Sequence, residues 1–379
     1  MRKLIVLALS MLALASPARG QEAPIWVESS DRATVAKAGI TVPLSAGTLK
    51  VVELREFGNG GVDVYAQYQS ADEAVFGTIF VYAPTLPDIG LTFLATDEAI
   101  RRRLGASTHV AKDRLVPVAG VRDAGRRIIY EGAEAGKTAS AAIFTRAGSW
   151  VVVVRVSGPA AREAEITAGV DALLTKMTFP KGSEPLRANV IKVEPCTPVS
   201  RLIAAKTIKP DMGDAGMFAL MAEPGVVDDK GHSALNPLRK VPDRLCRESS
   251  ELRGTIPVQI FRAVEKSDLP FMPRLYVLHG DAGIMIEVSE PRDKPGSFYV
   301  LRHGVGRMYA FGMLDRQPSK AQLWALIDGP DVQPSFARFT SKYLTADGHD
   351  SLSIDCSRTA EGCQSETAKT PADKPQSSR

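Results

Sequence analysis

Long hydrophobic runs are absent from the chain after its N-terminal segment. Each later apolar stretch is shorter than the roughly 18 residues that a membrane-spanning helix requires. The N-terminal segment reads MRKLIVLALSMLALASPARG, with Arg2 and Lys3 before an apolar stretch over 4–15 and small residues near its end. This order is typical of a secretory signal peptide. We therefore predict a signal peptide over residues 1–20, no transmembrane anchor, and a periplasmic or secreted location.

An excess of one charge is also missing. The chain has 47 Lys and Arg against 43 Asp and Glu, and the predicted signal peptide takes basic residues only. Binding to nucleic acid depends on a clear basic excess, so we expect no nucleic-acid partner. The basic run from Arg101 to Arg103 predicts a solvated helix face, and contact with an anionic lipid or glycan is the alternative.

Histidine is scarce, and the short motifs of familiar catalytic sites are absent. None of the 5 histidines lies in H-E-x-x-H, and there is no G-x-S-x-G elbow, Walker loop or G-x-G-x-x-G after a strand. We therefore predict no catalytic, metal-binding or cofactor-binding residues, no cofactor, and a non-catalytic protein. The alternative is an exported hydrolase or metal-dependent enzyme of unknown substrate.

The best candidate site for that alternative is a ligand edge formed by His279, Asp281 and His303. These residues belong to two similar stretches, "YVLHGDAG" and "YVLRHGVG", which predict two successive hairpins. Alternate turns of a meander fall at the same end of a sheet, so the two imidazoles and the carboxylate could together bind a metal or an anion. The opposing interpretation is that the His-Gly pair only suits a turn.

Only 4 cysteines occur, and all of them lie in the second half of the chain. An even number in an exported chain favours disulfides, and four cysteines allow three connectivities. We predict the pairs Cys196–Cys246 and Cys356–Cys363 because each closes a simple loop. A metal site is the alternative, but no C-x-x-C pair or His-x-His spacing supports it.

Composition divides the chain into two regular regions. The segment over 179–189 has two prolines, a glycine and mixed charges, and it predicts a linker over 181–190, between a first domain over 21–180 and a second over 191–356. Residues 357–379 include no large apolar side chain, so they are predicted to form a disordered tail.

Hydrophobic periodicity predicts an α+β fold for both domains, each a mainly antiparallel sheet with flanking helices. Helices are expected over 89–104, after Pro159 and after Pro318, where apolar residues recur at helical spacing. The other apolar segments alternate or run short as strands do, and short turns join them. Because both halves end in a strand, a proline and a helix, we also consider a tandem duplication.

The strand predicted over 149–157 places a charge, Arg155, within a valine run. Alternation puts Arg155 and the odd-numbered valines on one face and the even-numbered valines on the other, so both faces should be covered. A tight turn would set Arg155 opposite Ser140, and the expected carboxylate partner is Glu131 or Glu134. We interpret Arg155 as a structural rim charge in an ion pair, and contact with an anionic ligand is the alternative.

The order "GRRIIYEG", "SAAIFTRAGSWVVVVRVSGP" and "VDALLTKMTF" resembles the closing hairpin and C-terminal helix of PsbP-like α/β/α sandwich proteins, over about residues 35–180. The resemblance implies a non-enzymatic binding or assembly-support domain, and it supplies no catalytic residue. Together with the missing motifs, it predicts an exported protein that binds an envelope protein or a small ligand. The sequence does not specify an oligomeric state.

Overall fold

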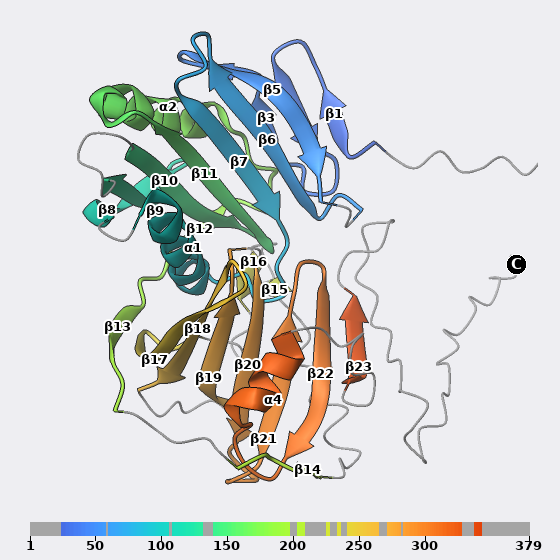
Figure 1. The fold of residues 1–379 in the computed structure, drawn as a ribbon. Coiled ribbons are helices and arrows are strands. Elements are labelled where there is room, and N and C mark those ends of the chain that lie inside the picture. The colour runs from blue at the N-terminus through green and yellow to red at the C-terminus, as the bar shows by residue number, and fades with distance from the viewer. Residues whose placement is uncertain are drawn as a thin grey trace, which may run out of the picture.

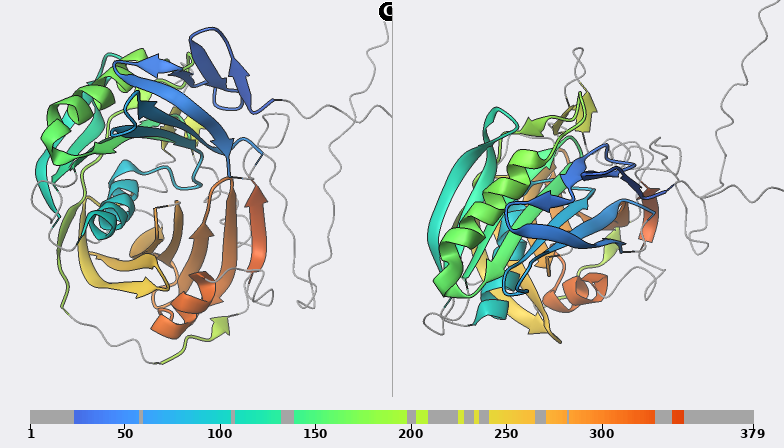
Figure 2. Two further views of the ribbon diagram at one scale, coloured as in Figure 1. Left: turned by 45° about the horizontal axis from the view of Figure 1, so that its top comes forward. Right: turned by 90° about the horizontal axis from the view of Figure 1, so that it is seen from above.

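Two large β-sheets dominate the fold, and the longest helix lies between them. In Figure 1 the sheets lie one above the other, and the left view of Figure 2 shows α1 (Ile89–Leu104) enclosed by both. The predicted signal peptide and the predicted tail fall outside the described residues and stay predictions. The computed structural model describes residues 24–57, 60–105, 108–131, 139–197, 203–208, 225–227, 233–235, 241–264, 271–281, 283–327 and 337–342.

The first large sheet has the strand order β4-β5-β6-β7-β11-β10-β9-β8, with β12 beside β10, and all its pairs are antiparallel. Strands β7 and β11 are central neighbours although α1 and three strands separate them in the sequence. The strands are β4 (Ser45–Ala46), β5 (Leu49–Glu56), β6 (Asp63–Ser70), β7 (Phe76–Tyr82), β8 (His109–Val118), β9 (Val121–Glu131), β10 (Ala139–Ala147), β11 (Trp150–Gly158) and β12 (Pro185–Leu186).

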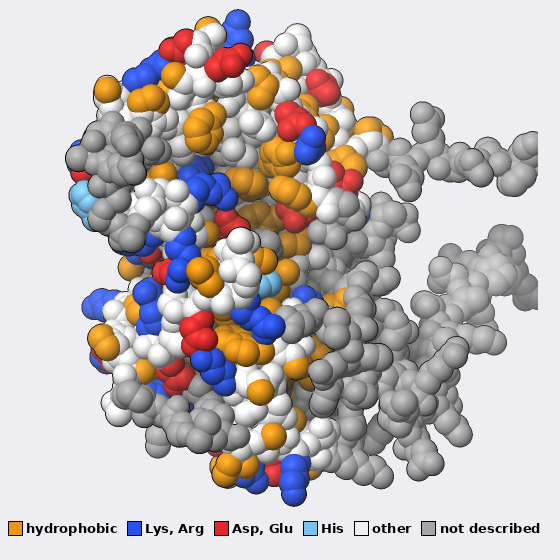
Figure 3. Space-filling model, in the orientation of Figure 1, with side chains coloured by type: hydrophobic (Ala, Val, Ile, Leu, Met, Phe, Trp, Pro, Cys, Tyr) orange, Lys and Arg blue, Asp and Glu red, His pale blue; other side chains and the backbone are white. Residues whose placement is uncertain are grey.

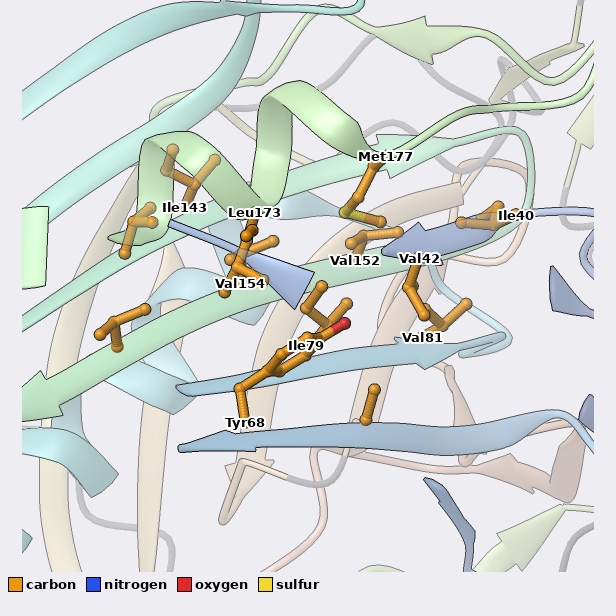
Figure 4. Packing of buried hydrophobic residues seen from close by; sticks show 14 of the residues in the cluster. Ile40, Val42, Tyr68, Ile79, Val81, Ile143, Val152, Val154, Leu173 and Met177 are labelled. Atoms are coloured by element: carbon orange, nitrogen blue, oxygen red, sulfur yellow. The ribbon is translucent and has the colours of Figure 1, made fainter. Parts of the chain in front are cut away.

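The outer face of this sheet packs under α2 (Glu163–Lys176) and a small sheet of β1 (Trp26–Glu28), β2 (Arg32–Val35) and β3 (Thr41–Pro43). A 3₁₀ turn, η1 (Ala160–Arg162), leads into α2. Figure 4 shows Leu173 of α2 close to Val154 of β11. The even-numbered valines of β11 belong to this cluster and the odd-numbered ones to the cluster on the other face, which confirms the predicted two-sided burial.

The second large sheet contains an uninterrupted meander from β17 to β22, with β14 and β23 both paired to β22 and a parallel strand, β13, at its other edge. Helix α4 (Lys320–Ile327) packs on its outer face. The strands are β13 (Lys192–Pro195), β14 (Thr207–Ile208), β17 (Arg244–Arg253), β18 (Ile256–Ala263), β19 (Phe271–His279), β20 (Ile284–Pro291), β21 (Phe298–His303), β22 (Arg307–Leu314) and β23 (Ala337–Lys342). In a separate small sheet, β15 (Gly225–Val227) pairs antiparallel with β16 (Ser233–Leu235).

A single hydrophobic cluster fills the space between the two sheets. Phe144 of β10 stacks edge-on against Phe93 of α1 with ring centroids 5.7 Å apart, and Tyr276 and Leu278 of β19 belong to the same cluster. The start of α1 is fixed by Asp88, whose carboxylate accepts a hydrogen bond from the Leu91 backbone N–H at 2.8 Å. The inner faces of both sheets are therefore buried against the same helix.

The predicted α+β class is wrong, because the described part of the chain is mainly β-sheet with few, short helices. The helices at 89–104, after Pro159 and after Pro318 do form, but α1 lies between the sheets and serves both of them. The large sheets also differ in strand order, since the first joins two meanders on either side of α1 in the sequence, whereas β17 to β22 lie side by side in chain order. Some strands that the sequence did not predict, such as β17, are rich in polar residues. A polar strand shows little alternation of apolar and polar residues, so the sequence pattern does not reveal it.

Part of the predicted linker is bound to the first half of the chain. Strand β12 pairs with β10, and the Asn189 side-chain amide donates to the Asp88 carboxylate at 2.9 Å. The same side chain accepts a hydrogen bond from the Gly90 backbone N–H at 3.0 Å. The division into two domains stays a prediction, and the segment between them is anchored at the N-terminus of α1.

The predicted disulfide between Cys196 and Cys246 is confirmed. Such bonds are typical of proteins from oxidising compartments. The second predicted pair, Cys356–Cys363, lies outside the described residues. No helix in the described part of the chain is long and apolar enough to cross a membrane.

Candidate functional site

A cavity of about 390 Å³ opens where the inner face of the first sheet meets α1 and a turn of the second sheet. Figure 3 shows hydrophobic side chains set back between the two sheets, with acidic and basic side chains beside them. The described residues that line the cavity are Phe57, Asp63, Phe80, Tyr82, Thr96, Arg103, Val153, Arg155 and Asp281.

Three neighbouring strands of the first sheet form one wall. Asp63 at the start of β6 pairs with Tyr82 of β7, and Phe80 of β7 pairs with Val153 of β11. Directly opposite residues in an antiparallel pair point to the same face, and residues two apart in a strand do so as well. The register therefore brings these side chains and Arg155 together on the inner face.

Helix α1 and the second sheet supply the rest of the lining. Thr96 is buried on α1, Arg103 is exposed in its last turn, and Asp281 is exposed in the turn between β19 and β20. Neighbouring turns dock directly on the first half, since the Thr85 backbone N–H donates to the Gly304 carbonyl at 3.0 Å. The site thus depends on how the two halves pack together.

The environment of Arg155 differs from the sequence prediction in its register. Ala147 pairs with Trp150, so the hairpin turn contains two residues and Arg155 lies opposite Ala142. The predicted pairing with Ser140 is wrong by two positions. Ser140 still contacts the arginine diagonally, because the Arg155 Nε donates to its Oγ at 3.0 Å.

Among the described residues, no carboxylate forms an ion pair with Arg155. Glu131, one predicted partner, lies 3.1 Å from the His109 ring instead, and Glu134 is outside the described residues. Burial, followed by repulsion from Arg103, lowers the pKa of Arg155 to about 10. The guanidinium is still cationic at neutral pH, and Tyr130 and Asp281 stabilise its charge electrostatically without forming a hydrogen bond or ion pair with it.

Asp63 is the second unusual group of the site. Burial, followed by repulsion from Glu56, raises the pKa of its carboxyl to about 6. Burial also raises the pKa of the neighbouring Tyr82 hydroxyl. At neutral pH the Asp63 carboxylate is therefore ionised, although burial and the charge of Glu56 disfavour its ionised form.

Replacing Asp63 with asparagine is expected to stabilise the protein at pH 7.5 and to have little effect at pH 4. The unfolded carboxyl releases its proton near 3.8 and the native one near 6, so the wild type loses stability as the pH rises between these values. After allowance for the partial exposure of Asp63, the variant is expected to gain about 2 kcal/mol in free energy of unfolding at pH 7.5 relative to the wild type. Urea unfolding at both pH values measures it, and an equal gain at pH 4 would contradict the assignment.

The histidine edge does not assemble as the alternative hypothesis requires. His279 pairs with Ile284, whereas His303 pairs with Met285. Consecutive residues of a strand point to opposite faces, so the two imidazoles lie on opposite sides of the second sheet. Of the three predicted edge residues, only Asp281 lines the cavity.

His303 is instead fully buried beneath the first half of the chain. Its Nδ1 lies 3.0 Å from the Thr85 hydroxyl and its Nε2 lies 3.0 Å from the Glu287 carboxylate. These contacts join β21 and β20 to the segment that precedes α1. Within the described ranges, no group of three or more His, Cys, Asp or Glu side chains could hold a metal ion.

Sequence reasoning singled out Arg155 and Asp281, and it reached Arg103 through the basic run. Arg101 and Arg102 form ion pairs with Asp97 and Glu98, one turn back along α1. Sequence reasoning missed the other lining residues. The one clue was that Asp63 of β6 and the aromatic residues of β7 lie on the same face as the odd-numbered valines of β11, and those valines indicated that this face is covered.

Comparison with known proteins adds no family. No protein-family model matches this chain, and no curated protein matches it either. The case for a function therefore depends on the geometry and charge of the cavity.

Proposed function

We propose that this protein is a non-catalytic, exported binding protein that holds a small molecule in the cavity between its two sheets. The cavity carries the proposal. Its volume of about 390 Å³ lies within the range of about 300–1,000 Å³ that small-molecule sites occupy, and it combines apolar walls with a few polar groups, as such sites do.

The chemistry of the lining favours binding over bond-making. The described lining residues include no serine, cysteine or histidine, so a nucleophile activated by histidine has no candidate here. An exported location is supported by the charged and apolar order of the first twenty residues and by the Cys196–Cys246 disulfide.

Filling the cavity is expected to abolish binding of a small apolar probe. Thr96 is buried on α1 and lines the cavity, so Thr96→Trp places an indole in the space that a ligand would occupy. The neutral dye N-phenyl-1-naphthylamine should give saturable fluorescence with the wild type. We expect its affinity to fall at least about tenfold in the variant, which corresponds to about 1.4 kcal/mol.

Thr96→Val is the matched control, because it keeps the size of the side chain and leaves the cavity open. It should bind the dye as the wild type does. Thermal unfolding of all three proteins checks that each one is folded. Absence of saturable dye binding to the wild type, or equal binding by the tryptophan variant, would refute the proposed function.

A further inference from the structure

We propose that the ligand is an amphipathic monocarboxylate, with its acid group held by Arg155 and Arg103 and its apolar body against the sheet. This inference rests on the proposed binding function. It goes further by assigning the chemical class of the ligand and the residues that select it.

Arg155 presents an oriented cation to the cavity. The hydrogen bond from its Nε to Ser140 fixes one side of the guanidinium, and neither terminal nitrogen bonds to any described residue. A largely buried charge is costly without a partner. The two parallel N–H groups of a guanidinium match the two oxygens of a carboxylate, so a ligand carboxylate satisfies the charge and the geometry together.

Arg103 supplies a second cation from the opposite wall. Its neighbours in the basic run form ion pairs one turn back along α1, but Arg103 has no ion pair among the described residues. Its charge lies close enough to lower the pKa of Arg155. Two repelling cations at one cavity are relieved by an anion that contacts both.

The two acids of the cavity limit how much negative charge the ligand can carry. Asp63 and Asp281 line the same space, so a dianionic phosphate monoester would meet more repulsion than a monocarboxylate would. Asp63 and Asp281 would attract an ammonium group, but Arg155 and Arg103 line the same cavity and would repel it. The two arginines and two acids of the lining cancel in formal charge at neutral pH, so the preference for one carboxylate rests on the guanidinium that Ser140 orients.

The apolar part of the lining determines the rest of the ligand. Phe80 and Val153 pair directly and Tyr82 lies two residues along β7 from Phe80, so their side chains share one face, and Phe57 adds a further ring. Aromatic and aliphatic side chains in this arrangement suit a ligand body that buries apolar surface. A medium-length alkyl chain is therefore a suitable probe.

Displacement of bound N-phenyl-1-naphthylamine tests the inference with four ten-carbon competitors: decanoate, decanol, decyl phosphate and decylamine. With the wild type, decanoate should displace the dye at concentrations at least about tenfold lower than the other three. Arg155→Met should remove this preference while the neutral dye still binds. Asp63→Asn should strengthen it, because a negative charge leaves the cavity.

Equal displacement by decanoate and decanol from the wild type would overturn the inference, as would a stronger effect of decyl phosphate or decylamine. A preference that persists in Arg155→Met would do the same. Should that variant fail to fold, Arg155→Gln and the wild-type comparison decide the matter. Dye binding without carboxylate preference would leave the proposed function intact, whereas absence of dye binding would remove it.

Discussion

Replacement of Phe144 by alanine is expected to lower the free energy of unfolding by about 4 kcal/mol and to shift the unfolding of both halves of the chain together. Phe144 is fully buried and stacks on Phe93 of α1. The cluster that contains both rings also includes Tyr276 and Leu278 of the second sheet. A cavity at Phe144 therefore weakens the packing of α1, on which both sheets depend.

Unfolding of each half can be followed separately by tryptophan fluorescence in two variants, one that keeps only Trp150 and one that keeps only Trp324. Trp150 lies in the outer cluster of the first sheet and Trp324 lies on α4 against the second. In urea, both signals should move to the same lower midpoint when Phe144→Ala is added. Phe76→Ala is the control, because Phe76 is 47% exposed on the same sheet and should cost less than about 1 kcal/mol. A Trp324 signal that stays at its original midpoint would refute a shared core.

The parts of the fold that depend on local pattern could be predicted from the sequence. The helix predicted over 89–104 forms over those residues, and the valine strand is buried on both faces as its alternation requires. In both cases the side chains within a few residues of one another determine the outcome. The disulfide between Cys196 and Cys246 followed from simple loop closure.

The remaining features depend on contacts between distant segments. Strand β17 pairs along its length with β18, yet its polar sequence gives no alternation. The placement of α1 between two sheets requires knowledge that both sheets exist and face each other. Short-range periodicity contains no such information.

The candidate site was hidden for the same reason. Its wall requires β7 to lie beside β11, although α1 and three strands separate them in the sequence. The predicted environment of Arg155 failed because the hairpin turn has a different pair of residues, and a register shift changes every cross-strand neighbour. The sequence singled out Arg155, but it did not predict that the terminal nitrogens of its guanidinium lack a hydrogen-bond partner among the described residues.

Removal of the Cys196–Cys246 disulfide is expected to lower the free energy of unfolding by about 4 kcal/mol, because the bond closes a loop whose ends are 50 residues apart. It ties the end of β13 to β17, and β13 is the parallel edge strand of the second sheet. Losing the bond frees this edge, where a salt bridge between Glu194 and Arg244 is exposed and contributes little.

Dithiothreitol should therefore lower the urea midpoint of the wild type and leave that of the double variant Cys196→Ser, Cys246→Ser unchanged. The matched control is Cys356→Ser, Cys363→Ser, which keeps the bond at the sheet edge and should still respond to the reductant. If the two double variants respond alike, the stabilisation comes from elsewhere. If the urea midpoints reported by Trp150 and Trp324 both decrease when the bond is reduced, the loss of the disulfide in the second half also destabilises the first half. The shared core around α1 requires this result.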